Sequence, residues 1–244
     1  MNRLNLIQSS FLILILMAFL VFIINAAEAD FLVRDLFDDL PTGTLPEGWT
    51  VVGEESGVKV VEEPSATNKS LLIEGIGAGV HVRRAFEPQT GVITIEVRFM
   101  PQVMTGGNYG LPYVEEQDVA LGGPVGAVCI LHRNGGIDYY NGGWVNFATI
   151  EEGTWYEIKI VTSNDSKTYD LYFNGDEIVT GAAHRNEYES LGELLFGPGV
   201  AHTGGNKFLY DYVLVYEGTE KPEPASISPS EKLTTTWGEI KLEH

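Results

Sequence analysis

The chain has 244 residues, a single cysteine and a formal net charge of −19 at pH 7. This acidity argues against nucleic acid and anionic membrane surfaces as partners, because both are negatively charged and would repel the protein. One cysteine excludes an intrachain disulfide, and we expect Cys129, which lies in an apolar stretch, to be a buried and unreactive thiol.

Residues 1–29 have the pattern of a secretory signal peptide. Arg3 precedes the apolar run Phe11–Ile24, and Ala27-Glu28-Ala29 supplies a small-x-small cleavage site. An uncleaved membrane anchor is the alternative, but the run is short for a spanning helix, which needs roughly 20 apolar residues. Cleavage at Ala29 predicts a secreted protein, extracellular or periplasmic, that retains no membrane span.

After the signal peptide, the chain predicts many short strands separated by turns rich in glycine, proline and asparagine. The predicted strands outside the central hairpins are Phe31–Phe37, Trp49–Val52, Val58–Val61, Ser70–Glu74, Gly79–Phe86, Gly91–Met100, Val125–Arg133, Ile137–Asn141, Trp144–Ile150, Glu193–Phe196 and Lys207–Tyr216. Between them, Met104–Pro124 is rich in glycine, tyrosine and acidic residues, and its length predicts a functional loop at the mouth of a binding face.

The strongest signal is a pair of consecutive hairpins. Trp155–Thr162 and Thr168–Asn174 both alternate apolar and polar residues, which is typical of half-buried antiparallel strands. Asn174-Gly175 then provides the positive-φ pair of a tight turn into the strand Glu177–Thr180. Two hairpins with one apolar face must cover a second layer, so they predict a sandwich.

About fourteen strands and no amphipathic helix predict an all-β fold, a two-sheet antiparallel β-sandwich of the jelly-roll type. We expect this domain to occupy residues 30–217. Residues 218–244 begin with a proline-rich linker and carry too few apolar side chains for a core of their own. We therefore expect a linker and a short tail, which either frays or serves for docking or sorting.

Three segments carry a resemblance to a known superfamily: Asn134-Gly135-Gly136-Ile137-Asp138-Tyr139, then Gly153–Ile160, then Tyr169–Gly175. In these segments the chain resembles the concanavalin A-like, laminin G-like jelly-roll superfamily, and the likeness extends over Phe31–Glu217. The superfamily includes lectins, adhesive modules, glycoside hydrolases and polysaccharide lyases. The resemblance therefore implies the fold and leaves the activity open.

Catalysis is the less favoured expectation. The resemblance implies that a hydrolase would carry paired acids as E-x-D-x-E on one strand, and the chain has no such pattern. The nearest approach, Glu115–Asp118, is expected to be a solvated acidic loop. A lyase would use a Tyr/His pair with arginine, and residues of these types are present, but the net charge of −19 opposes a polyanionic substrate. Whether the protein is an enzyme stays open.

Binding without chemistry is the leading expectation, with a glycan or a cell-surface partner as ligand. Sugar rings stack on Trp and Tyr, and their hydroxyl groups bond to Asn, Asp, Arg and His. The strands around residues 138–146 offer such side chains in alternation, and the preceding loop adds tyrosines. The candidate ligand-binding residues are Arg83, Arg98, Tyr113, His132, Tyr140, Trp144 and Asn146.

A structural calcium site is the remaining expectation. Calcium takes six to eight oxygen ligands, mainly from carboxylates, carbonyls and water. Asp38 and Asp39 follow the first predicted strand, and Asp211 lies in the last. Because first and last strands often pair in this type of fold, these three acids could meet at the place where the ends of the domain join. The alternative is that each aspartate caps a turn.

Overall fold

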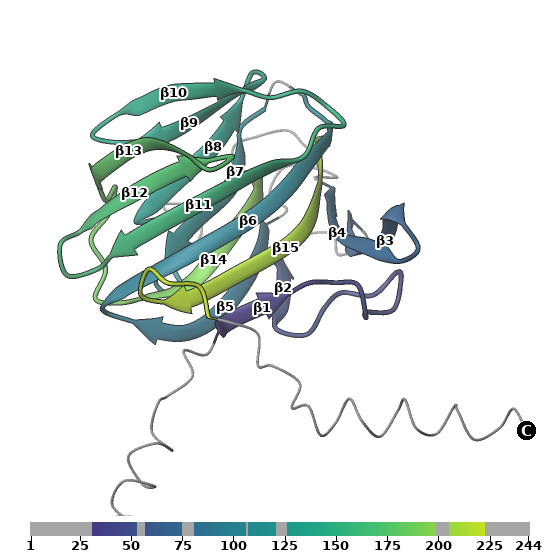
Figure 1. Ribbon diagram of the computed structural model, residues 1–244, viewed down its shortest axis with the longest axis horizontal. Helices are drawn as coiled ribbons and strands as arrows, with labels where there is room; N and C mark the ends of the chain where they lie inside the picture. Colours follow the sequence, from purple (N-terminus) through teal and green to yellow (C-terminus); the bar gives the residue numbers. More distant parts are fainter. Residues whose placement is uncertain are drawn as a thin grey trace, which may run out of the picture. The chain divides into compact units, whose positions relative to one another are not determined.

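The computed structural model describes residues 31–52, 57–74, 81–105, 107–120, 126–198 and 205–222. Within these ranges the chain forms fifteen β-strands and no α-helix (Figure 1). No helix in the described part of the chain has the length and apolarity needed to cross a membrane. The predicted signal peptide, and the predicted tail from residue 223 onward, lie outside the described residues.

Sheet A forms the layer that contains the two central hairpins. Its strand order is β13 (Asp176–Ala183), β12 (Thr168–Phe173), β11 (Tyr156–Ser163), β6 (Val92–Val103), β15 (Lys207–Glu217), β4 (Asn68–Glu74) and β3 (Val58–Ser65). β1 (Phe31–Asp35) pairs with the second half of β15, beyond the point where β4 ends. All of these pairs are antiparallel.

Sheet B forms the other layer, behind sheet A in the view of Figure 1. Its strand order is β10 (Trp144–Thr149), β9 (Gly136–Tyr140), β8 (Val128–Arg133), β7 (Tyr109–Glu115), β14 (Leu191–Pro198), β5 (His81–Gln89) and β2 (Trp49–Val52). Every neighbouring pair is again antiparallel. The prediction of an all-β, two-sheet antiparallel sandwich is confirmed.

The hydrophobic core lies between the two sheets. Alternate residues of the central strand β6, such as Ile95 and Val97, are fully buried, as are Ile158 and Ile160 on the neighbouring β11. Phe208 of sheet A stacks on Tyr109 of sheet B, with ring centroids 4.2 Å apart. Aromatic contacts across the interior therefore add to aliphatic burial in holding the layers together.

The two predicted hairpins are present almost as the alternation indicated. β11 and β12 pair from Ile158↔Phe173 to Ser163↔Thr168, and β12 then pairs with β13. Asn174 and Gly175 both have positive φ, 50° and 86°, as a tight turn of this type requires. The buried face carries Tyr169 and Leu171, which confirms the face that the pattern indicated.

The prediction of one long loop at residues 104–124 is wrong in its middle part. Residues 109–115 form β7, a central strand of sheet B between β8 and β14. Tyr109, Leu111 and Val114 from this strand are fully buried in the core. Glu115 is buried as well, so the expectation that this acid belongs to a solvated loop is also wrong.

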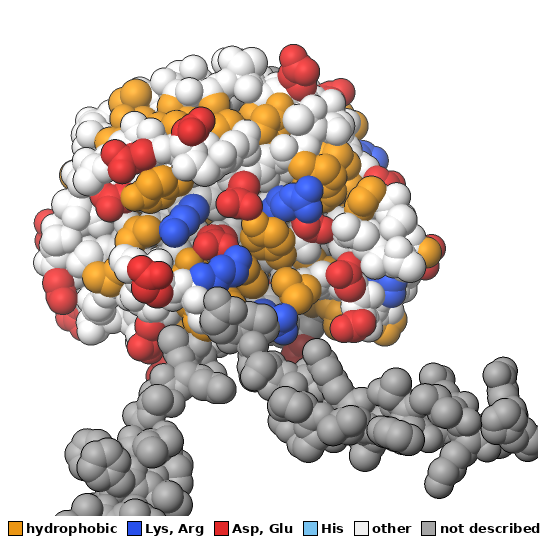
Figure 2. Space-filling model, viewed as in Figure 1, with side chains coloured by type: hydrophobic (Ala, Val, Ile, Leu, Met, Phe, Trp, Pro, Cys, Tyr) orange, Lys and Arg blue, Asp and Glu red, His pale blue; other side chains and the backbone are white. Residues whose placement is uncertain are grey.

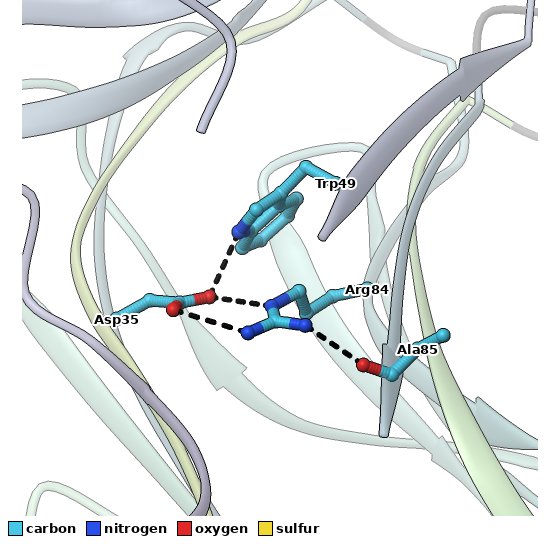
Figure 3. Close-up of polar contacts among 4 residues, drawn as sticks. All are labelled: Asp35, Trp49, Arg84 and Ala85. Carbon is cyan, nitrogen blue, oxygen red and sulfur yellow. Dashed lines mark hydrogen bonds and ion pairs between the residues drawn. The ribbon is translucent and has the colours of Figure 1, made fainter. Parts of the chain in front are cut away.

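One polar contact joins the two sheets at the edge of the sandwich (Figure 3). Trp49 of β2 and Arg84 of β5 both point toward the carboxylate of Asp35 of β1. The Trp49 Nε1–H and Arg84 Nε–H donate to Asp35 Oδ2 at 2.8 and 2.7 Å, and Arg84 Nη2 donates to Oδ1 at 3.3 Å. Because β1 belongs to sheet A while β2 and β5 belong to sheet B, the contact of Asp35 with Trp49 and Arg84 connects the layers.

Candidate functional site

Sheet B presents an outer face that differs in chemistry from the core face. On β8, Val128 and Ile130 belong to the core, so the intervening Cys129 and Leu131 point the other way. The strand register aligns Tyr113 of β7 with Cys129, and Asp138 of β9 with Leu131. The outer face of sheet B therefore follows from the alternation of each strand, and it carries most of the candidate residues.

An aromatic–arginine platform, made of Tyr140, Trp144 and Arg185, lies at the β9–β10 end of this face. Trp144 sits directly opposite Tyr140, and their rings meet edge to face with centroids 5.6 Å apart. The guanidinium carbon of Arg185 lies 5.5 Å from the centroid of Tyr140 and 5.6 Å from that of Trp144. All three side chains are partly exposed, so solvent reaches the platform.

A set of polar side chains continues the platform along β8, β9 and β10. Asn146 lies opposite Asp138 and donates from Nδ2 to Asp138 Oδ1 at 2.9 Å and to the Ile137 carbonyl at 3.2 Å. Asp138 is 2% exposed and forms an ion pair with Arg133. Beside the partly exposed rings, Asn146 is exposed and Arg133 is partly exposed, so their amide and guanidinium groups can bond to ligand hydroxyl groups, while the buried Asp138 carboxylate holds both in place.

Two glutamates face each other farther along the same sheet. Glu115 of β7 and Glu193 of β14 are directly opposite in the strand register and are 0% and 4% exposed. Burial, together with the Glu193 charge, raises the pKa of Glu115 to about 7. Burial also raises the pKa of Glu193, and Arg83, whose Nη1 lies 3.2 Å from Glu193 Oε2, opposes that rise.

Arg83 and Tyr113 complete the middle of this face. Arg83 Nη2 donates to the Val119 carbonyl at 2.7 Å, which holds the residues after β7 against β5. Tyr113 lies between Cys129 and Leu195 in the register, and burial raises the pKa of its hydroxyl group. Burial likewise raises the pKa of the Cys129 thiol to about 12, as expected for an unreactive cysteine.

The structure brings five of the seven predicted ligand-binding residues to the outer face of sheet B: Arg83, Tyr113, Tyr140, Trp144 and Asn146. It does not bring the other two. His132 points into the core, where its ring lies 5.7 Å from Phe208 and its Nε2 accepts the Gly135 N–H at 3.2 Å. His132 therefore does not join Arg83 and Tyr140 on the outer face of sheet B.

Arg98, the seventh residue, lies on sheet A. Its Nη1 contacts Asp211 Oδ2 at 2.5 Å, and its guanidinium carbon lies 4.9 Å from the ring centroid of Trp155. Figure 2 shows the side of the molecule over β11, β6 and β15, where acidic and basic side chains alternate with hydrophobic ones. This face is separate from the one that carries the other five residues.

The structure does not bring the three aspartates expected to hold calcium together in one site. Asp38 Oδ1 accepts the Lys69 N–H at 2.9 Å, and Asp211 pairs with Arg98. Asp39 is exposed. In the described ranges, no group of three or more His, Cys, Asp or Glu side chains could hold a metal ion. Asp38, Asp39 and Asp211 therefore do not form the predicted calcium site, and calcium binding elsewhere stays a prediction.

Sequence reasoning missed Arg185 and the Glu115–Glu193 pair. Arg185 follows β13, in a polar stretch whose composition alone suggested a loop, and its backbone N–H donates to the Ala127 carbonyl at 2.7 Å. No local signal places it on Trp144. Glu115 and Glu193 meet only because β7 and β14 are neighbours in sheet B, and the sequence indicated neither that pairing nor β7 itself.

Comparisons with known proteins support the fold. No family model and no curated protein sequence matches the chain. A sialidase structure matches 75% of this chain with 11% identity and a TM-score of 0.60, and the chain spans 18% of that sialidase. The carbohydrate esterase vb_24B_21 from Shiga toxin-encoding bacteriophage phi24B matches 78% of this chain and 100% of its own length, with 15% identity and a TM-score of 0.52. At these identities the likeness concerns the fold alone.

Proposed function

We propose that this protein is a secreted carbohydrate-binding domain of the concanavalin A-like, laminin G-like jelly-roll type, and that it binds glycan on the outer face of sheet B. The observation that carries the proposal is the exposed platform of Tyr140, Trp144 and Arg185 beside a fixed row of hydrogen-bonding groups. The fold likeness to a sialidase and a carbohydrate esterase agrees with a carbohydrate-related role.

The platform has the two features that sugar recognition needs. An aromatic ring offers an apolar face with a negative quadrupole, on which the C–H face of a sugar ring can stack. Asn146 and Arg133 lie along the same face and are held by the buried Asp138, and a sugar hydroxyl group can accept from their amide and guanidinium N–H groups. Sites of this kind combine aromatic walls with a few placed polar groups.

The acid pair provides the alternative function, which is a glycan-active enzyme. Hydrolases cleave glycosidic bonds between two carboxyl groups, and Glu115 and Glu193 are a pair of carboxyl groups on the candidate face. Both side chains are almost completely buried, however, so neither touches solvent where a substrate would lie. Burial of the acids, against exposure of the platform, is the reason to place binding before catalysis.

The binding proposal is tested by a matched pair of tryptophan variants. Trp144 and Trp155 are both partly exposed and both lie under an arginine, but Trp144 begins β10 of sheet B and Trp155 lies just before β11 of sheet A. On a panel of immobilised polysaccharides, we expect Trp144→Ala to weaken retention about tenfold or more, because it removes the stacking surface. Trp155→Ala should bind as the wild type does.

Two results would contradict the proposal. Equal losses in both variants would remove the assignment to sheet B, and retention of none of the polysaccharides by the wild-type protein would favour a purely adhesive module with a protein partner. Release of reducing ends or unsaturated products from the same panel would establish the enzymatic alternative. In that case Glu115→Gln should abolish product release, while Trp155→Ala should leave it unchanged.

A further inference from the structure

The buried glutamates of sheet B share one nearby cation. On adjacent antiparallel strands, directly opposite residues have Cβ atoms about 4.5–5.5 Å apart, so the register brings the carboxyl groups of Glu115 and Glu193 close to each other. Arg83 lies on the Glu193 side and is itself only slightly exposed. Two carboxylates this close titrate as a pair, because ionisation of one opposes ionisation of the other.

Two buried oxygen atoms without a hydrogen bond also indicate that the two acids titrate as a pair. Glu115 Oε1 and Glu193 Oε2 are both buried without a hydrogen bond in the described structure, although Glu193 Oε2 lies within ion-pair distance of Arg83. A buried acceptor without a hydrogen bond is unfavourable, because the group has lost its contact with water and gained no other partner. One proton held between the two carboxyl groups would give both oxygens a partner, as a donor on one acid and an acceptor on the other.

Besides Arg83, the groups of the surrounding strands and loops do not supply a second positive charge to balance the two acids. The titratable or charged groups coupled to these two acids are Arg83, Tyr113, Asp118, Cys129 and Tyr188. Burial raises the pKa of Tyr113, Cys129 and Tyr188, so these three remain neutral near pH 7. Arg185 acts on Tyr113 and Cys129 and not on either acid, and its guanidinium lies over the platform rings.

A continuous series of contacts runs from Glu115 to the platform. Glu115 Oε2 accepts the Gly126 N–H at 3.0 Å, and the Gly126 carbonyl accepts Asn186 Nδ2–H at 2.7 Å. The next carbonyl, of Ala127, accepts the Arg185 N–H at 2.7 Å. The residues that place Arg185 on Tyr140 and Trp144 are therefore bonded to the same short segment that Glu115 holds.

We propose that Glu115 and Glu193 form a proton-binding site that controls the position of Arg185 on the platform. With one proton bound, the two acids are held together and Glu115 anchors Gly126. When that proton leaves, the carboxylates repel each other, the anchor shifts, and Arg185 moves relative to Trp144 through Gly126, Ala127 and Asn186. Only the consequence for carbohydrate binding rests on the proposed function; the movement itself occurs without a ligand.

The pH range of this change separates it from histidine titration. The raised pKa of Glu115, about 7, places the loss of the proton near neutral pH. Burial lowers the pKa of His81 and of His132, and burial lowers that of His184 to about 4. A transition near pH 7 that disappears in Glu115→Gln is therefore assigned to the acid pair.

The test uses the ligand-free, full-length mature protein labelled with 5-fluorotryptophan. The Trp144 resonance is assigned by its loss in Trp144→Phe and is followed by fluorine NMR from pH 5 to pH 9. We expect a shift with a midpoint near pH 7 in the wild type, no shift near neutral pH in Glu115→Gln, and a lower midpoint in Glu193→Gln, which removes the repulsion. Glu96→Gln, a buried glutamate on sheet A, is the matched control and should leave the midpoint unchanged.

Three outcomes would overturn the proposal: a Trp144 resonance that does not change through neutral pH in the wild type, a transition that persists in Glu115→Gln, or an equal effect of Glu96→Gln. A folded spectrum at pH 5 shows that each variant is intact. Because no carbohydrate is present, failure here leaves the proposed function standing. A negative polysaccharide panel, conversely, leaves this titration valid.

Discussion

At the scale of single residues, Glu115 shows how position changes the behaviour of a common side chain. Its carboxyl group is fully buried opposite Glu193, and one of its oxygens accepts the Gly126 N–H. The neutral form is favoured because burial penalises charge and the neighbouring acid repels it. The pKa of about 7 follows from these two causes and gives the folded state a proton that the unfolded chain lacks at pH 6.

This difference in proton binding predicts the pH dependence of stability. Between the ordinary pKa of glutamic acid and about 7, the native state binds more protons than the unfolded state, so the free energy of unfolding falls as pH rises. The loss contributed by Glu115 is on the order of 3 kcal/mol. We expect Glu115→Gln to remove this part of the decline when urea unfolding is compared at pH 5 and pH 8. Parallel profiles for wild type and variant would contradict the assignment.

Gly126 is a second residue whose environment matters, because its backbone conformation and its close neighbours both require glycine. It has φ of +84°, and a Cβ built there would lie 2.8 Å from Cys129 Sγ and 3.2 Å from Tyr113 Cβ. Gly175 has a similar φ of +86° but open space around it. We expect Gly126→Ala to lower the free energy of unfolding by about 2–4 kcal/mol and Gly175→Ala by about 1–2 kcal/mol. Chemical denaturation of both variants measures these losses. Equal losses would show that backbone strain at positive φ, and not crowding around the added Cβ, determines the destabilisation.

At the scale of elements, local alternation was sufficient for the hairpins but not for β7. The strands β11, β12 and β13 follow each other directly, so their pattern and the Asn174-Gly175 turn are contained in one stretch of sequence. β7 contains Gly110 and Pro112, which usually exclude a central strand. The structure accommodates them where the register with β8 shifts between Gly110 and Tyr113, so that Pro112 has no Cα partner there.

The same distinction explains which parts of the candidate site could be predicted. Tyr140, Trp144 and Asn146 belong to one hairpin, and alternation along β9 and β10 places them on one face. Arg185 and the Glu115–Glu193 pair depend on contacts between distant parts of the chain, which single-sequence periodicity does not contain. His132 belongs to a strand that the sequence predicted, but the pattern did not show that its side of β8 faces the core.

At the scale of the whole domain, the sandwich is held by its apolar interior and by the contact of Asp35 with Arg84 and Trp49 (Figure 3). Both charged side chains are less than one-fifth exposed, at 16% for Asp35 and 18% for Arg84. Removal of one partner leaves the other charge largely buried, which is costly. This contact therefore matters more than an ion pair at the surface.

A comparison of two aspartates tests this view. We expect Asp35→Ala to lower the free energy of unfolding by about 2–4 kcal/mol, because Arg84 and the Trp49 N–H lose their acceptor. Asp211→Ala removes the partner of Arg98, whose side chain is 38% exposed, and should cost about 0–1 kcal/mol. Urea unfolding of both variants gives the answer, and a larger loss for Asp211→Ala would reverse the ranking.

The effect of calcium on stability is also predicted at the scale of the whole domain. The predicted ligands Asp38 and Asp211 are engaged by Lys69 and Arg98, so we expect the thermal unfolding midpoint to be the same in EDTA and in excess calcium. A lower midpoint in EDTA would reveal a calcium site formed by other residues.

The most direct test of the carbohydrate-binding face is hydrogen exchange of the protein with and without the polysaccharide that it retains most strongly. Bound glycan should slow amide exchange in β9 and β10 and around Arg185, where Tyr140 and Trp144 form the platform. Exchange in β11, β12 and β13 of sheet A should not change. Protection confined to sheet A, with none in β9 and β10, would contradict the account.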